Sequence, residues 1–522
     1  MKIALFNHPY YDFYATPQRT YSQLLEYLGK IIAPEHEYRC YPVSDKKTTA
    51  VLPKTLVYLK PYLIENIAHY SFFHQYYRFG SPDSFNKEDL FHFAPDVILI
   101  TSFAFAYFDG FKEQAEYLKS IFPDTPIICG GQGPSSSPQY YWKNSSVDYV
   151  IKGPAETGLP GLLNYLSGKQ KTPPENIYGK DIVYRENLSS EYSFQPFTDI
   201  NGKTAHLHFT RGCPKRCTYC SVHAASGHLF LKSRLEDAAR TIQSLPENIR
   251  YIDIEDDNIS TDREYFKAVI RMIQKAFPHS KIGSENGMDF TTLDEELIRF
   301  LVDHNICKWN LSMVSVSSET LHKSKRNYLP ELFEKTLEKI LQYSVPVTVY
   351  FISGLKNDTL DNVLKSLFFL AEKNVIIGFS PFYPVPGTSE AEHLQISSPL
   401  FARGTSCYGW NSITTEEQIS VFTLSRFINA IKRYSRQEWL NAAKKYLPVI
   451  AERIPEECGR DTATWFGVFY SLKKRCIAAV NRKGEISRFP MDEKVLRVFF
   501  REWDDGLKIR LTDGVFDQFL ID

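Results

Sequence analysis

Three cysteines in one short run, Cys213, Cys217 and Cys220, have the spacing in this chain that most clearly predicts chemistry. The run has the pattern C-x3-C-x2-C, and an aromatic residue, Tyr219, directly precedes the last cysteine. Three thiolates on one loop can bind three irons of a [4Fe-4S] cluster and leave the fourth iron open. Ferredoxin runs that serve two clusters use four cysteines at other spacings. The motif therefore predicts a cluster that binds a ligand as well as carrying electrons.

Zinc and disulfide bonds are the two alternatives for these cysteines. Zinc accepts a Cys3His ligand set, which His223 could complete. Structural zinc sites usually pair one cysteine knuckle with a distant second one, and the sequence has no second knuckle. An odd total of nine cysteines in 522 residues, without the apolar stretch of a signal peptide, does not indicate a disulfide scaffold. The iron–sulfur interpretation is the stronger one.

The cysteine run lies in a region, residues 204–390, where short apolar strands alternate with amphipathic helices. This order is typical of βαβ units and a parallel sheet. One expected helix, Leu293–His304, begins with a capping box from Thr292 to Glu295. The run directly follows the first strand, so we expect it at the carboxyl ends of the strands. The expected strands are Ala205–Thr210, Arg250–Glu255, Lys281–Glu285, Trp309–Val314, Val345–Ser353 and Val375–Ser380, and a further helix is Asp262–Phe277.

Residues 1–170 predict a separate domain, a doubly wound (Rossmann-like) parallel sheet. In such sheets ligands bind beyond the carboxyl ends of the strands. Residues 171–203 are expected to be a mostly irregular linker, and residues 391–522 a mainly helical region that caps the substrate pocket. The expected N-terminal elements are strands Lys2–Asn7, Asp96–Ser102, Pro126–Cys129 and Asp148–Ile151 and helix Gly110–Ile121; the C-terminal ones are helices Thr415–Tyr434 and Gln437–Leu447 and strands Cys476–Arg482 and Leu507–Leu511.

The cysteine run and the strand order after it resemble the radical S-adenosylmethionine (SAM) enzymes. The resemblance implies a partial (β/α)6 TIM-type barrel, in which SAM binds the open iron and is cleaved to a 5′-deoxyadenosyl radical. Two segments depart from the family: Asn310–Ser315 lacks a Gly-x-Glu-Ser-Gly pattern, and Lys356–Thr359 replaces Pro-Gly-Glu-Thr. The SAM contacts that the resemblance implies are Tyr219, Asp256, Asp257, Glu285, Ser312, Ser315 and Gly354.

The segments Pro95–Ser102, Pro126–Pro134 and Val147–Gly153 resemble the cobalamin (B12)-binding domain that precedes many radical SAM domains. No Asp-x-His-x-x-Gly motif supplies a histidine ligand, and His8 is a single loop histidine in the corresponding place. The relatives' Gly-Glu-Gly-Glu is reduced to Gly153-Pro-Ala-Glu. The cobalamin contacts that the resemblance implies are Ser102, Gly130, Gly131 and Gln132, where glycines allow close approach of the backbone.

Together these resemblances, which cover about residues 1–390, predict a radical SAM enzyme that is a cobalamin-dependent methyltransferase. We expect it to methylate an unactivated carbon of a small molecule, lipid or natural product, with electrons from a flavodoxin or ferredoxin. A radical cyclase, oxidase or rearrangement enzyme, or a non-catalytic cluster-carrying sensor, is the alternative. A methylthiotransferase is not expected, because the N-terminal third has no second cysteine trio. No residue is singled out as the catalytic group.

Charge and hydropathy narrow the choice of partners. Lys plus Arg and Asp plus Glu both number 61, so no net field favours nucleic acid or an anionic membrane. No run reaches the roughly 20 apolar residues that span a bilayer. We therefore expect a cytoplasmic protein without an integral membrane segment or a nucleic-acid partner.

Overall fold

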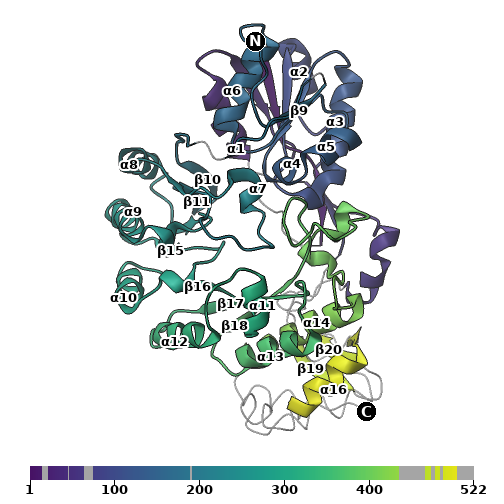
Figure 1. Cartoon of the computed structure of the whole chain (residues 1–522), viewed down its shortest axis with the longest axis vertical. Coiled ribbons are helices and arrows are strands. Elements are labelled where there is room, and N and C mark those ends of the chain that lie inside the picture. Colours follow the sequence, from purple (N-terminus) through teal and green to yellow (C-terminus); the bar gives the residue numbers. More distant parts are fainter. Residues whose placement is uncertain are drawn as a thin grey trace.

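The computed structural model describes residues 1–13, 22–44, 46–63, 75–180, 182–188, 191–433, 465–471, 476–481 and 486–502. In Figure 1 the N-terminal domain forms one end of the molecule, and the barrel and the C-terminal elements form the other. Two expected elements, helix Gln437–Leu447 and strand Leu507–Leu511, fall outside the described residues. Within the described part of the chain, no helix combines the length and apolar character needed to span a membrane.

The N-terminal domain is built on a six-stranded sheet with the order β3-β1-β6-β7-β8-β9. The first five strands are parallel and the edge strand β9 is antiparallel, so the predicted doubly wound sheet is confirmed. Its order places a switch point between β1 and β6, where such sheets bind ligands. The strands are β1 (Lys2–Phe6), β3 (Glu37–Tyr41), β6 (Val97–Thr101), β7 (Ile127–Gly130), β8 (Tyr149–Ile151) and β9 (Ile177–Gly179).

The side chains of β1 point alternately to the two faces of this sheet, and helices cover both faces. Ile3 and Leu5 pack with α1 and α6, whereas Ala4 and Phe6 pack with α2, α3 and α5. Strands buried on both faces read as continuous apolar runs, as β1, β6 and β7 do. A small antiparallel sheet joins β2 (Tyr10–Asp12), β5 (Tyr77–Phe79) and β4 (Lys47–Thr49). The helices are α1 (Ser22–Ile32), α2 (Lys87–Phe93), α3 (Phe108–Ile121), α4 (Gln132–Ser136), α5 (Pro138–Asn144) and α6 (Ala155–Leu166), and a 3₁₀ segment covers Lys54–Tyr62.

The second unit is a partial barrel of six parallel strands, and all six predicted strands are present. Strands β11, β14 and β15 form one group and β16, β17 and β18 the other, with parallel bridges Ile282–Ile306 and Met288–Leu311 between the groups. The six strands are β11 (Thr204–His208), β14 (Tyr251–Ile254), β15 (Lys281–Gly283), β16 (Trp309–Val314), β17 (Val347–Ser353) and β18 (Ile376–Pro381).

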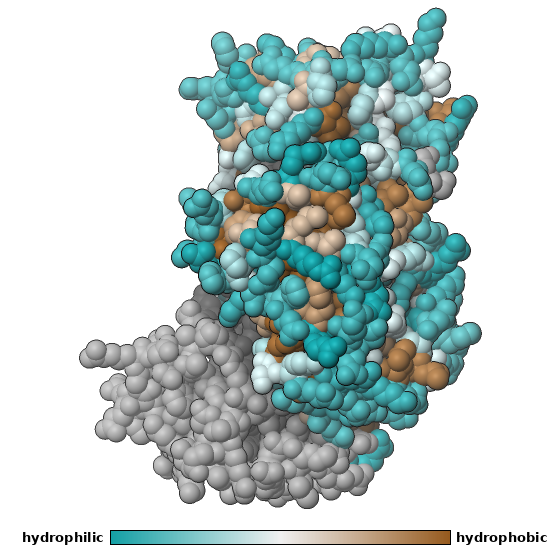
Figure 2. Space-filling view, turned by 90° about the vertical axis from the view of Figure 1, so that its left-hand side faces the viewer, coloured by the Kyte–Doolittle hydropathy of each residue, from teal (hydrophilic) through white to brown (hydrophobic). Residues whose placement is uncertain are grey.

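Helices cover the outside of this barrel and follow one another down the left of Figure 1. Figure 2 shows this side as largely hydrophilic, with hydrophobic residues in separate patches, as amphipathic helices require. The helices are α8 (Leu235–Gln243), α9 (Arg263–Ala276), α10 (Glu295–Asp303), α12 (Pro330–Leu341) and α13 (Leu360–Ala371), with the short α7 (Val222–Ser226) and α11 (Ser318–Lys323) at the mouth.

One expectation about local structure is corrected. Helix α10 is capped by Asp294, whose carboxylate accepts the Leu297 amide at 2.9 Å, and not by Thr292. Thr292 ends a preceding 3₁₀ turn, and its hydroxyl donates to the Asp289 carbonyl at 2.7 Å. The expected linker, residues 171–203, holds two short strands: β9, which extends the N-terminal sheet, and β10 (Phe197–Asn201), which pairs antiparallel with β11.

C-terminal elements cover the open edge of the barrel at β18. Asn429 of α14 (Thr415–Arg433) accepts the Ile377 amide at 2.8 Å and donates to the Ile377 carbonyl at 2.9 Å. An edge strand needs such partners for its unpaired backbone groups. Beyond α14 lie a three-stranded antiparallel sheet, β19 (Trp465–Ser471), β20 (Cys476–Asn481) and β21 (Ile486–Pro490), and helix α16 (Glu493–Glu502).

Candidate active site

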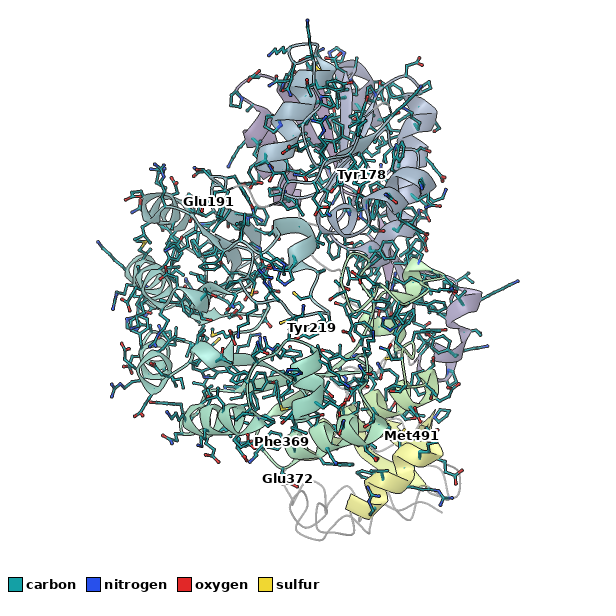
Figure 3. The ribbon with its side chains drawn as sticks, in the orientation of Figure 1. Tyr178, Glu191, Tyr219, Phe369, Glu372 and Met491 are labelled. Carbon is teal, nitrogen blue, oxygen red and sulfur yellow. The ribbon has the colours of Figure 1, made fainter. Side chains whose placement is uncertain are left out.

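The three cysteines lie on the loop between β12 (Thr210–Arg211) and α7, at the carboxyl end of the first barrel strand. Figure 3 places Tyr219 of this loop in the middle of the molecule, between the N-terminal domain and the barrel. The Cys220 amide donates to the Cys217 carbonyl at 3.2 Å, which turns the chain back on itself. Cys217 is buried, and Cys213 and Cys220 are partly exposed.

Nitrogen donors are directed at two of the three sulfurs. The Asn258 side-chain amide donates to Cys213 Sγ at 3.4 Å, and Arg326 Nη1 lies 3.9 Å from Cys217 Sγ. Burial raises the pKa of Cys213 and raises that of Cys220 to about 12, so a bound metal must supply the charge that deprotonates them. Three thiols with N–H donors beside them fit an iron–sulfur cluster, whose sulfurs accept such hydrogen bonds.

Two acidic residues after β14 fix the start of the cysteine loop. The buried Asp256 carboxylate accepts the Phe209 amide at 3.1 Å and also the amide and hydroxyl of Thr210. Asp257 accepts the Gly212 amide at 2.9 Å. Burial raises the pKa of Asp256 to about 7. These hydrogen bonds give Asp256 and Asp257 a positioning role, and their contact with SAM stays a prediction.

Four further residues predicted to contact SAM lie on or directly after three barrel strands, β15, β16 and β17. Glu285 is exposed, pairs with Lys308 and accepts the Asn310 side-chain amide at 3.2 Å. The Ser315 hydroxyl is buried and already accepts the Ser317 amide at 3.0 Å. Ser312 is half-buried on β16, and Gly354, at φ +90°, follows β17. A role in SAM binding remains a prediction for each.

Sequence reasoning missed two residues that organise the loop. Arg326 also donates to the Ser312 carbonyl at 3.1 Å, and so connects the cysteine loop to β16. Glu390 accepts the Thr218 hydroxyl at 2.7 Å and the Lys356 amide, while its own amide donates to the Thr218 carbonyl at 3.0 Å. Both lie more than 100 residues from the cysteines in the chain, so only the fold brings them near.

The predicted cobalamin contacts lie together at the carboxyl edge of the N-terminal sheet. The Ser102 hydroxyl is buried, 3.2 Å from His8 Nε2 and 2.9 Å from the Tyr141 hydroxyl. His8 Nδ1 donates to the Pro9 carbonyl at 2.7 Å, and burial lowers the pKa of His8 to about 4. Both ring nitrogens of the neutral imidazole are therefore used, which argues against His8 as a metal ligand.

A cavity of about 760 Å³ separates this edge from the barrel. Gln132 and Ser221 both line it, and the Gln132 side chain donates to the Ser221 carbonyl at 2.6 Å, one residue beyond Cys220. The N-terminal domain therefore meets the cysteine loop directly. A large aromatic-lined space beside that contact fits a large planar ligand. Its aromatic lining residues are Phe13, Phe103, Phe105, Tyr107, Tyr350, Phe379, Tyr383 and Phe422.

Protein-family models match the part of the chain that holds the cysteine loop and also the N-terminal domain. The Radical SAM superfamily model matches residues 207–370, and the B12 binding domain model matches residues 87–163. These matches lie within the regions predicted as residues 204–390 and 1–170.

The curated relatives have low sequence identity to this chain. The tRNA-2-methylthio-N(6)-dimethylallyladenosine synthase of Buchnera aphidicola subsp. Schizaphis graminum is 24% identical over 292 residues, which cover 53% of this chain and 64% of the relative. That of Sulfurihydrogenibium sp. (strain YO3AOP1) is 25% identical over 284 residues, covering 52% and 63%. The chain thus spans less than two thirds of the length of these relatives.

Solved structures share the fold. The radical SAM methyltransferase TsrM from Kitasatospora setae, with cobalamin and a [4Fe-4S] cluster bound, has a TM-score of 0.54 at 17% identity, over 74% of this chain and 73% of that one. The cobalamin-dependent SAM radical enzyme OxsB, with aqua-cobalamin and SAM bound, has a TM-score of 0.52 at 11% identity, over 98% and 71%. The two domains imply a [4Fe-4S] cluster, SAM and cobalamin as cofactors. This chain contains a radical SAM domain and, ahead of it, a B12-binding domain.

Proposed function

We propose that this chain is a cobalamin-dependent radical SAM methyltransferase that acts on an unactivated carbon of a small molecule, lipid or natural product. The cavity between the two domains is the observation that carries the proposal. Gln132, from the glycine-containing turn after β7, and Ser221, from the cysteine loop, border the same space. A ligand in that space is within reach of both cofactor-binding domains.

In the proposed reaction, the residues of this chain bind the cofactors and orient them. Cys213, Cys217 and Cys220 are assigned as the three iron ligands, with a flavodoxin or ferredoxin as the electron donor. When bound, the cluster supplies the electron that cleaves SAM, and cobalamin supplies a carrier for the methyl group. Asn258 and Arg326 direct N–H groups at the ligand sulfurs.

The lining of the cavity favours a large, planar or apolar substrate. Aromatic side chains come from both domains, and the buried Arg403 uses its two terminal nitrogens on the Tyr11 and Ala106 carbonyls, at 2.8 and 2.7 Å. Those hydrogen bonds fix the orientation of the Arg403 side chain at the cavity wall, where Arg426 is a second cation. Aromatic faces give large contact areas to planar ligands.

The curated relatives favour a second candidate, methylthiolation of tRNA. Two features of this chain argue against it. Cys40 and Cys129 are the only cysteines that precede Cys213, so the N-terminal third cannot supply a second trio of thiolates. Cys129 is also fully buried within β7. The equal numbers of acidic and basic residues give no net attraction to the phosphates of tRNA.

Product analysis of the anaerobically reconstituted, chemically reduced protein with SAM tests the proposal. Mass spectrometry would measure 5′-deoxyadenosine and S-adenosylhomocysteine, with and without cobalamin. We expect the wild type to form 5′-deoxyadenosine and the Cys213→Ala/Cys217→Ala/Cys220→Ala variant to form none. We expect the wild type to form S-adenosylhomocysteine only when cobalamin is present.

Other outcomes identify the alternatives. Deoxyadenosine without cobalamin-dependent S-adenosylhomocysteine would favour a cyclase, oxidase or rearrangement enzyme. Absence of both products from a protein with an intact cluster would favour a sensor. Appearance of a methylthio-nucleoside after incubation with bulk tRNA would move the assignment to the second candidate.

A further inference from the structure

A second cluster of metal-binding side chains lies inside the barrel, apart from the cysteine loop. On β11, His206 and His208 alternate with Ala205 and Leu207, which belong to the core under the helices. Because successive side chains of a strand point to opposite faces, both histidines point to the interior of the barrel. Strand β14 repeats the pattern: Ile252 and Ile254 belong to the same core, and their neighbours Asp253 and Glu255 point inward.

Strand register brings these four side chains together. His206 is the register partner of Asp253 in the parallel pair β11–β14. His206 Nδ1 lies 3.1 Å from Asp253 Oδ2 and 3.5 Å from Glu255 Oε1, and His208 Nε2 lies 3.4 Å from Glu255 Oε2. One ligand atom from each of His206, Asp253 and Glu255 lies within 4.8 Å of the other two.

The carboxylates of this arrangement are buried. Asp253 is fully buried, Glu255 is 3% exposed and His206 is 9% exposed. Two carboxylates converge on one ring nitrogen, which carries at most one proton and donates at most one hydrogen bond. Asp199 of β10, the antiparallel register partner of His206, adds a third buried carboxylate to the same face. Like charges in a buried site repel one another. The Lys308 ammonium interacts with Asp253 and pairs with Glu285, and a metal ion among the carboxylates would oppose their repulsion directly.

The distances agree with the size of a metal site. Bonds of about 2.0–2.1 Å to nitrogen and oxygen in a tetrahedron place neighbouring ligand atoms about 3.3 Å apart. The two separations from His206 Nδ1, 3.1 and 3.5 Å, lie on either side of that value. One or two imidazoles with two carboxylates suit a divalent transition-metal ion better than Mg²⁺ or Ca²⁺, which prefer oxygen ligands alone.

We propose that His206, Asp253 and Glu255, with His208 beside them, bind one divalent transition-metal ion of the Zn²⁺ or Mn²⁺ class inside the barrel. The ion joins β11 to β14. The first of these strands leads into the cysteine loop, and the second is followed by Asp256 and Asp257, which hold that loop. None of the three cysteines belongs to this metal site, so the metal would be bound in addition to the cluster.

Metal binding to the full-length, cluster-reconstituted protein tests the proposal. The protein would be dialysed to equilibrium against Zn²⁺, and in parallel against Mn²⁺, and analysed by plasma mass spectrometry. We expect one added ion per chain, and at least 10-fold weaker binding in Asp253→Asn and in Glu255→Gln. The asparagine oxygen can still accept the Glu285 amide, which Asp253 Oδ1 holds at 2.8 Å.

Iron content and melting temperature serve as internal controls, since both should match the wild type if the fold and the cluster are intact. His223→Gln is the matched variant. His223 lies against His228, with ring centroids 4.2 Å apart, so this pair of imidazoles is another place that could take up the added ion. We expect this variant to bind the ion as the wild type does. Wild-type protein that takes up neither ion, or a well-folded Asp253→Asn that binds it equally tightly, would overturn the proposal.

Discussion

At the scale of single residues, Arg326 is the clearest case of a side chain that only the fold connects to the candidate cluster. A contiguous motif such as the cysteine run can be recognised in the sequence because its spacing is local. Arg326 has no such signal: it lies 109 residues from Cys217 and approaches its sulfur because β16 and α11 place it there. The same reasoning applies to Glu390, 172 residues from Thr218.

Arg326 also provides a test of the cluster environment that does not depend on substrate. A buried cation beside a sulfur ligand stabilises the reduced, more negative state of the cluster and so raises its reduction potential. Loss of one charge-assisted hydrogen bond, about 1.5 kcal/mol, corresponds to a fall of about 60 mV for a one-electron couple. We therefore expect Arg326→Met to lower the potential by about that amount in a redox titration followed by electron paramagnetic resonance.

Arg326→Lys keeps the charge and should shift the potential less. Lys215→Met is the matched control, because Lys215 is a cation on the same loop but pairs with Asp289. It should leave the potential close to that of the wild type. An unchanged potential in Arg326→Met would mean that the guanidinium does not interact with the cluster.

At the scale of elements, the turn after β7 distinguishes glycines that the fold requires from those it does not. Gly131 has φ +113°, and a Cβ there would lie 2.3 Å from the Ser102 carbonyl oxygen. Its neighbour Gly130 would place a Cβ no closer than 3.8 Å to Ile151. Gly131→Ala should therefore destabilise the N-terminal domain by about 2 kcal/mol or more, whereas Gly130→Ala should be nearly neutral. Thermal unfolding of the two variants measures the difference, and equal melting temperatures would contradict it.

Element patterns explain why most of the fold was predictable and some of it was not. The four predicted strands of the N-terminal sheet are mostly buried apolar runs, whereas barrel strands such as β11 and β14 alternate apolar and polar residues. Period and composition reveal both patterns. Strand β3 (Glu37–Tyr41) was missed because only its last residue is buried. Caps depend on which of several adjacent polar residues meets the backbone, so Asp294 and not Thr292 begins α10. The two glycines were indistinguishable without the position of Ser102.

At the scale of the whole molecule, segments far apart in the chain join the N-terminal domain to the barrel. Arg403 follows the last barrel strand, is 6% exposed, and donates to the Tyr11 carbonyl at 2.8 Å and to the Ala106 carbonyl at 2.7 Å. Its guanidinium also lies 5.2 Å from the centre of the Tyr107 ring. Residues 391–403, predicted only as part of a capping region, therefore fasten the two domains beside the cavity. Such a contact has no local pattern, since its partners are backbone carbonyls.

Arg403→Met should weaken this connection while keeping a side chain of similar length. The variant leaves two carbonyl groups without their donor, at a cost of about 3 kcal/mol. Because the loss falls between domains and not within either core, we expect one calorimetric transition in the wild type and two in the variant. The earlier transition would correspond to the N-terminal domain. Arg263→Met is the control, since Arg263 forms a surface ion pair with Asp294, and such pairs contribute little. Unfolding of Arg403→Met in one transition at the wild-type temperature would contradict this prediction. It would mean that the remaining contacts, such as that from Gln132 to Ser221, hold the two domains together. The cavity between the domains would then not depend on Arg403.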